Sequence, residues 1–198
     1  SSAAALAAAP SGEGWEALFN GRDLTGWKGL VGNPKTRPLM KPDELAAAQK
    51  KADERMNAHW KVVDGTIQTP AQRSHLFTER EFKNFEFKAE VMTKSNSNGG
   101  IFIHTAYQDK DWPKQGYESQ VNNTFKPDPQ KTGGLYNTVK VLEPPAKDNE
   151  YWTQHVIVKG KHVVVKVNDK VVVDYTEPAD KPGPVKLSSG TFALQAHD

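Results

Sequence analysis

The stretch Val156-Ile157-Val158-Lys159-Gly160-Lys161-His162-Val163-Val164-Val165-Lys166-Val167-Asn168-Asp169-Lys170-Val171 decides the fold class. β-Branched residues fill its apolar runs, and such residues pack well on a pleated surface. The pairs Lys159-Gly160 and Asn168-Asp169 interrupt the runs with residues that favour tight hairpin turns. The stretch therefore predicts a meander of antiparallel strands.

The same pattern of short strand-like runs continues on both sides of this meander. The expected strands are His59–Val63, Thr66–Thr69, His75–Thr78, Phe85–Met92, Gly100–His104, Tyr117–Val121, Gly134–Val141, Trp152–Val158, His162–Val167, Lys170–Asp174 and Gly190–Ala196. Many short strands separated by Pro- and Gly-containing loops are typical of a sandwich or jelly roll. We therefore predict an all-β protein whose core lies between two antiparallel sheets.

One segment departs from the β pattern. Apolar residues recur at spacings of three and four at Leu45, Ala48, Ala52 and Met56, which predicts an amphipathic helix over about residues 42–58. Pro42 suits the first turn of that helix. We interpret the helix as an insertion in a single jelly-roll domain of residues 14–198, with residues 1–13 as a flexible N-terminal tail.

Composition excludes several classes of function. The 198 residues contain 26 Lys and Arg against 24 Asp and Glu, a balance that lacks the basic field of a nucleic-acid-binding protein. No apolar run approaches the length of a membrane span. The absence of cysteine excludes disulfides and cysteine-ligated zinc.

The Ala-rich start without Met resembles the remainder of a cleaved signal peptide, so we expect a periplasmic or secreted protein.

Three strand-like runs, Gly100–His104, Tyr117–Asn122 and Phe192–His197, contain polar side chains at every second position. If the runs belong to one sheet, the period of two places the following residues on one face: Phe102, His104, Glu118, Gln120, Asn122, Gln195 and His197. One such strand alone is more often solvated surface. Because His, Gln and Asn recur beside an aromatic ring with little Lys, we predict a carbohydrate-binding face.

Loops at the ends of these runs add candidate contacts. Tyr107 and Trp112 lie in the long segment 105–116, and aromatic rings on such loops stack against sugar faces. The segment 123–132 is a second long loop. Folding back over the sheet edge is an equally good explanation for Tyr107, whereas we favour sugar contact for Trp112.

The candidate catalytic residues are His104, Glu118 and His197. Together they suit either a divalent metal ion held by imidazole and carboxylate or a general base oriented by its neighbours, and both options stay open. Glu118 has no obvious acidic partner on its own strand, so a two-carboxylate glycosidase is not favoured. The other four histidines, including His75, are interpreted as structural.

Five motifs occur in the order Leu18–Trp27, His59–Gly65, Asn98–His104, Gly116–Gln120 and Thr132–Tyr136. Together they resemble the 3-keto-disaccharide hydrolase family. The resemblance implies a concanavalin A-like jelly roll, export from a bacterial cell and action on glycosides oxidised to a ketone at sugar C3. It also implies removal of the C2 proton, elimination of the C1 substituent and hydration, with a divalent ion or a cationic side chain stabilising the enolate.

Carried onto this sequence, the resemblance assigns the family's carboxylate to Glu118, its amide to Gln120, and the terminal Gln-x-His pair to Gln195 and His197. Tyr136, in the last motif, is expected to contact the sugar. The sequence departs from the family at His104, where many members have Arg. A lectin-like, non-catalytic carbohydrate-binding module is the alternative hypothesis.

Overall fold

The structure is a computed structural model that describes residues 3–6, 14–29, 31, 36–68, 74–105 and 115–196. Twelve strands form in these residues, together with the helix α1 (Pro42–His59) and a short 3-10 helix (Arg37–Leu39). The strands are β1 (Ala3–Leu6), β2 (Trp27–Lys28), β3 (Lys61–Val63), β4 (Thr66–Gln68), β5 (Ser74–Thr78), β6 (Phe85–Thr93), β7 (Gly99–Thr105), β8 (Tyr117–Val121), β9 (Trp152–Lys159), β10 (His162–Val167), β11 (Lys170–Thr176) and β12 (Thr191–Ala196).

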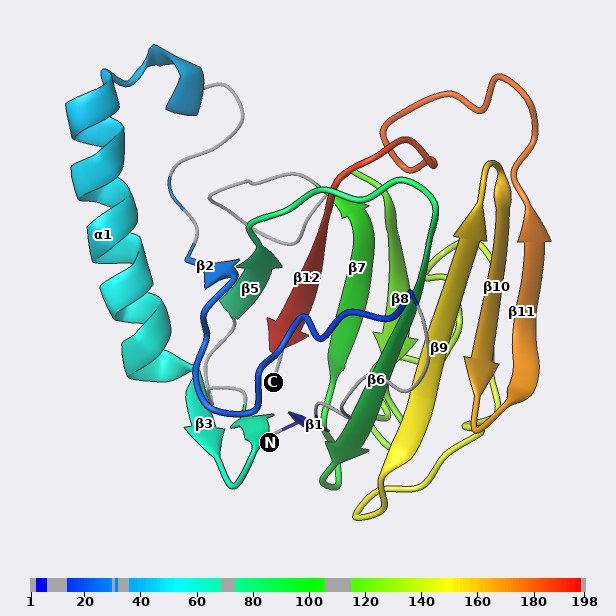
Figure 1. Ribbon diagram of the computed structural model, residues 1–198. Coiled ribbons are helices and arrows are strands. Elements are labelled where there is room, and N and C mark those ends of the chain that lie inside the picture. The colour runs from blue at the N-terminus through cyan, green and yellow to red at the C-terminus, as the bar shows by residue number, and fades with distance from the viewer. Residues whose placement is uncertain are drawn as a thin grey trace.

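The strands form two antiparallel sheets that pack face to face (Figure 1). One sheet has seven strands in the order β11-β10-β9-β6-β1-β4-β3, and the other has five in the order β2-β5-β12-β7-β8. The predicted sandwich is therefore confirmed. β9, β10 and β11 form the predicted meander, and its Asn168-Asp169 turn has positive φ at both residues, as a type I′ hairpin requires.

The main core lies between the two sheets. β9 and β10 supply a row of buried valines from the seven-stranded sheet, and these pack against Ile101 and Ile103 of β7 and Tyr117 and Val121 of β8. Because side chains alternate along a strand, Phe102 of β7 and Glu118 and Gln120 of β8 point away from the seven-stranded sheet. That outer face of the five-stranded sheet is the surface on which the predicted site residues were expected.

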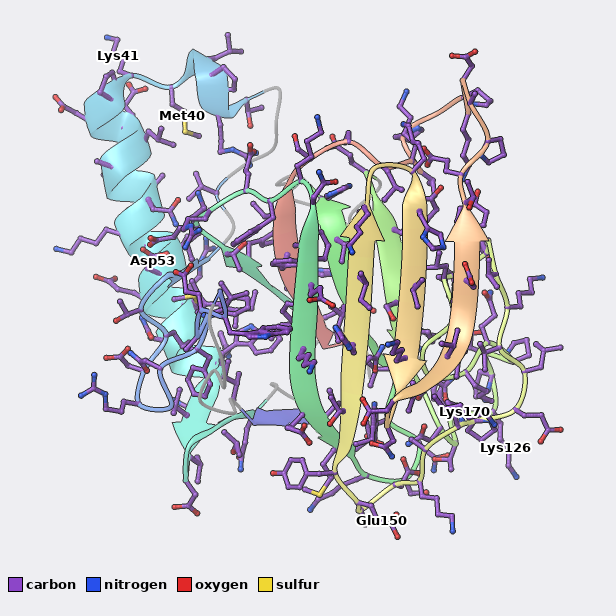
Figure 2. All side chains as sticks on the ribbon, turned by 45° about the vertical axis from the view of Figure 1, so that its right-hand side comes forward. Met40, Lys41, Asp53, Lys126, Glu150 and Lys170 are labelled. Atoms are coloured by element: carbon purple, nitrogen blue, oxygen red, sulfur yellow. The ribbon has the colours of Figure 1, made fainter. Side chains whose placement is uncertain are left out.

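The helix α1 forms where the periodicity predicts it and packs beside the sandwich next to β2 (Figure 1). Two of its residues, Ala52 and Met56, are buried, and Met56 belongs to a second apolar cluster that includes Trp27 and Trp60. Asp53 lies on the side of the helix that faces the sandwich (Figure 2), where its carboxylate accepts the backbone N–H of Gly29 at 2.9 Å. Among the described residues, no helix has both the length and the apolar composition needed to cross a membrane.

Two local expectations differ from the structure. Ala3–Leu6, expected to belong to a flexible tail, forms β1 and pairs with both β4 and β6. The segment 134–141, expected to be a strand, forms only isolated bridges at Leu135 because the chain turns at Asn137, which has φ +57°. This turn brings the backbone N–H of Tyr136 to the carbonyl of Glu118 at 2.9 Å.

Candidate functional site

The candidate site begins as two rows of residues across the outer face of the five-stranded sheet. In the pairing of β12, β7 and β8, Gln195 lies opposite Gly100, and Gly100 lies opposite Gln120. In the next row on the same face, Phe102 lies opposite Glu118. The structure therefore brings together Phe102, Glu118, Gln120 and Gln195, as the period of two predicts.

Two loops convert this face into a pocket of about 670 Å³. The segment 123–138 forms one wall, and the connection 177–190 between β11 and β12 forms another; Figure 1 shows that connection, in orange and red, crossing the end of the sandwich. The lining residues are Asn98, Phe102, Gly116, Glu118, Gln120, Asp128, Tyr136, Asn137, Thr138, Lys181, Pro184, Val185 and Gln195.

Glu118 is the half-buried carboxyl group of this pocket. Burial, with a smaller contribution from the negative charge of Asp128, raises its pKa to about 8. Both effects disfavour the carboxylate, since an ion loses hydration when it is enclosed and a like charge repels it. At neutral pH Glu118 is therefore mostly protonated, and a carboxyl group with such a pKa is poised to exchange a proton with a ligand.

Asp128 is an acidic neighbour of Glu118 that sequence reasoning placed in a loop but not in the site. Its carboxylate accepts the Tyr136 hydroxyl at 2.8 Å and the backbone N–H of Gln130 at 2.9 Å. Burial, followed by the bond to Asp128, raises the pKa of Tyr136 to about 12. The sequence signal was the length of the 123–132 loop at the end of β8. Tyr136 itself lines the pocket, as expected for a substrate contact.

Asn122 does not line the pocket, although it was predicted to bind substrate. Its side chain is completely buried, and its amide nitrogen lies within hydrogen-bond distance of the carbonyls of Phe125, Asp128 and Gln130. Its amide oxygen accepts the backbone N–H of Phe125. Asn122 therefore holds the 123–130 loop in place and has no group left to offer a ligand.

His104 does not share the face of Glu118, and this expectation is wrong. Between Phe102 and Thr105, β7 advances one residue more than its partner β12, and His104 has φ +50°. This bulge breaks the alternation and turns the imidazole inward. Its ring packs at 5.7 Å against Phe85 of the opposite sheet, and only 1% of the residue is exposed.

Both ring nitrogens of His104 are used within the protein. Nδ1 accepts the backbone N–H of Ser188 at 3.1 Å, so Nε2 carries the proton and donates to the carbonyl of Lys83 at 2.7 Å. Burial lowers the pKa of His104 and keeps the ring neutral. His104 thus anchors the connection 177–190 rather than acting on a ligand.

A divalent metal held by His104, Glu118 and His197 was one of the two options left open by the sequence, and the described residues do not fit it. Both nitrogens of His104 are occupied and face the core, away from Glu118. In the part of the chain that the structure describes, no group of three His, Asp or Glu side chains is arranged to hold a metal ion. His197, Tyr107 and Trp112 lie outside the described residues.

Two further residues near the site were not predicted from the sequence to belong to it. Lys181, from the 177–190 connection, is the one cationic residue among the lining residues that the structure describes. His75 of β5 lies opposite Gln195, and its ring is 5.7 Å from that of Phe102. The strand pattern placed His75 on β5 but gave no sign that β5 lies next to β12.

The fold and the pocket define a two-sheet antiparallel β-sandwich protein with a polar, carboxyl-containing pocket on one sheet. Residues 14–198 match the family described as 3-keto-alpha-glucoside-1,2-lyase-like domain, and the chain belongs to this family of carbohydrate-active proteins. The family predicted from the motifs is therefore confirmed. No protein with curated annotation matches the sequence.

Solved structures show the same fold. A candidate glycosyl hydrolase of Parabacteroides distasonis is similar with a TM-score of 0.71 at 21% identity, covering 92% of this chain and 87% of that chain. A second candidate glycosyl hydrolase of that organism has a TM-score of 0.59 at 20% identity, covering 71% of this chain and 83% of the other. The carbohydrate-binding module CBM66 of Bacillus subtilis has a TM-score of 0.51 at 15% identity, covering 88% and 89%.

Proposed function

We propose that this protein cleaves the glycosidic bond of 3-keto glycosides and that Glu118 removes the proton from sugar C2. The observation that carries the proposal is the raised pKa of Glu118, about 8, in a pocket otherwise rich in amide and hydroxyl groups. The description of the family, a 3-keto-alpha-glucoside-1,2-lyase-like domain, supports the choice of substrate.

The chemistry needs a single base. A carbonyl at C3 acidifies the C2 proton, so the carboxylate form of Glu118 takes that proton and the C–H electron pair becomes an enolate with its charge on O3. The enolate then re-forms the C3 carbonyl, a C1=C2 double bond forms, and the bond from C1 to the aglycone oxygen breaks. The aglycone oxygen leaves with the electron pair and receives the proton from Glu118.

Hydration completes the reaction. Water adds across the C1=C2 bond, with hydroxyl to C1 and hydrogen to C2, which gives the free 3-keto sugar. The amide groups of Gln120, Gln195 and Asn98 line the same pocket and are suited to bind the hydroxyls that orient the sugar ring. Phe102 supplies an apolar surface beside them.

The pKa of Glu118 suits a base in this role. A stronger base abstracts a weakly acidic carbon-bound proton more readily, and catalytic pKa values near the working pH balance that strength against the fraction ionised. At pH 7 about one tenth of a group with a pKa near 8 is carboxylate. We therefore expect activity to increase with pH up to about 8.

The test uses the 3-keto derivative of a simple alkyl glucoside, with the unoxidised glucoside as comparison. The wild-type protein should release the alcohol only from the keto substrate and should exchange the C2 hydrogen for deuterium in D2O. The substitution Glu118→Gln should lower turnover by about 100-fold or more. Glu143→Gln, at an exposed carboxylate outside the pocket, is the matched control and should not change it.

Two results would contradict the proposal in different ways. Full turnover by Glu118→Gln would remove this carboxyl from the chemistry. Binding of unoxidised oligosaccharides by the wild-type protein, with no product from either substrate, would instead indicate a non-catalytic carbohydrate-binding module.

A further inference from the structure

Lys181 occupies a distinctive place in the pocket. The connection 177–190 carries it into the wall formed with Pro184 and Val185. Its ammonium nitrogen lies 4.7 Å from the centre of the Tyr117 ring and donates a hydrogen bond to the Tyr117 hydroxyl at 2.9 Å. No described carboxylate lies within ion-pair distance of it. An ammonium group has three donors, so the charge and further N–H groups remain available for a ligand.

The Tyr117 hydroxyl accepts from Lys181 because its own proton is committed elsewhere. It donates to the buried carboxylate of Glu177 at 2.7 Å. Burial alone would raise the pKa of Glu177, but hydrogen bonds from Tyr117, from the Leu187 backbone and from Lys161 outweigh it and lower the pKa. Glu177 therefore stays ionised, and it keeps the tyrosine proton pointing away from Lys181.

The charge of Glu177 is already matched by another cation. Lys161 lies 3.1 Å from Glu177 Oε2, while the backbone N–H of Leu187 donates to Oε1 at 2.8 Å. Lys181 therefore meets a neutral hydroxyl and an aromatic face rather than a counter-ion. Both partners hold a cation in place without cancelling its charge.

Other contacts fix the connection that carries Lys181. His104 accepts the N–H of Ser188, and the N–H of Gly116 donates to the carbonyl of Pro184 at 3.1 Å. Lys181 is thus fixed in position before a ligand binds. A charge held in advance stabilises a developing anion without the cost of reorganisation.

We propose that Lys181 contacts O3 of the sugar and stabilises the negative charge that forms there when Glu118 removes the C2 proton. This role rests on the proposed function. The alternative use of such a cation, binding a group of the substrate that is already anionic, would act on affinity rather than on the chemical step. Tyr117 acts through Lys181 and is a positioning residue.

The experiment compares Lys181→Met and Lys181→Ala with Lys186→Met, which removes an exposed lysine from the same connection outside the pocket. On the 3-keto alkyl glucoside, Lys181→Met should lower kcat about 100-fold, a typical loss for one oxyanion-stabilising donor, with KM changed less than threefold. The rate of C2 deuterium exchange should fall in parallel. Lys186→Met should match the wild type in both.

Two additional measurements separate chemistry from folding. Ethylammonium added to Lys181→Ala should raise kcat at least tenfold. A loss of kcat caused by a folding defect would not be reversed by the added amine. Tyr117→Phe keeps the ring but removes the hydroxyl acceptor, and it should lower kcat with KM unchanged.

Each other outcome refutes a specific statement. Suppose that the wild type is active and that Lys181→Met has an undiminished kcat, or differs only by a raised KM. That result would overturn the role of Lys181 and leave that of Glu118 intact. Absence of both turnover and C2 exchange in the wild-type protein would refute the proposed function, and the role of Lys181 with it.

Discussion

Gly100 lies directly beneath the side chain of Glu118. A Cβ atom at position 100 would lie 2.8 Å from Cγ, Cδ and Oε2 of Glu118, closer than such atoms approach in proteins. Gly100 pairs with Gln120 of β8, one row along the sheet from Glu118. The missing side chain at Gly100 therefore makes the space in which the Glu118 carboxyl lies across the sheet.

Gly100→Ala should displace the Glu118 carboxyl and lower kcat/KM at least tenfold while the protein stays folded. The flexible end of Glu118 can move away from the new methyl group, so the cost falls on position rather than on folding. The measurements are turnover of the 3-keto glucoside and thermal unfolding.

Gly160→Ala is the control for that experiment, because it should change stability rather than activity. Gly160 has φ +58° in the β9–β10 turn and open space around it, so alanine there should cost about 1 kcal/mol of stability and leave activity unchanged. Unchanged activity in Gly100→Ala would mean that the position of this carboxyl does not matter for turnover.

Glu118→Gln should stabilise the protein above pH 5. The folded pKa of about 8 lies above the ordinary value of 4.5, so between these values the folded state binds a proton that the unfolded state has lost, and stability decreases as pH increases. Glutamine removes this penalty, which is on the order of 3 kcal/mol at pH 7. Urea unfolding should show the gain at pH 7 and little difference at pH 4; an equal gain at both would contradict the raised pKa.

The sequence predicted the sheet and part of the site because both depend on a local period of two. That period alone places Phe102, Glu118, Gln120 and Gln195 on one face. It failed at His104, where a single residue with positive φ reverses the side chain, and no residue in the quoted runs signals such a bulge.

The loop residues of the site could not be predicted in the same way. Asp128 reaches the pocket because Gln130 and Asn137 exchange two hydrogen bonds, at 2.8 and 2.7 Å, that close the 123–138 segment. The position of Lys181 depends on Glu177, a buried residue of the same 177–190 connection. These contacts join residues whose pairing has no periodic pattern.

Export from the cell stays a prediction.

His104→Asn should weaken the anchoring of the 177–190 connection. Asparagine tolerates positive φ but is too short to replace both ring hydrogen bonds, so we expect a loss of about 1–3 kcal/mol of stability at pH 7. Activity should fall as well, because the same connection carries Lys181. His59→Asn, in the exposed last turn of α1, is the control and should change neither.

The contribution of His104 to stability should also depend on pH. Its folded pKa is lowered, so as pH falls below 6.5 the unfolded imidazole gains a proton that the buried ring does not, and stability decreases. Urea midpoints of the wild type and His104→Asn should therefore converge as pH falls from 7 toward 5. A constant difference over this range would contradict a neutral, buried His104.

Asp128→Asn should shift the activity profile to lower pH. The Asp128 charge is the second cause, after burial, of the raised pKa of Glu118, so an uncharged amide at this position lowers that pKa and ionises the base earlier. Tyr136→Phe is the matched comparison, because it removes the hydroxyl that donates to Asp128 but keeps the charge. The measurement is kcat/KM for the 3-keto glucoside between pH 5 and 9, and the acidic limb of this profile reports the pKa of the free enzyme's base.

The acidic limb should move to lower pH for Asp128→Asn. For Tyr136→Phe it should stay in place or move slightly upward, since an uncompensated Asp128 repels the Glu118 carboxylate at least as strongly. Equal downward shifts in both variants would show that the hydrogen bond, and not the charge, controls the ionisation of the base.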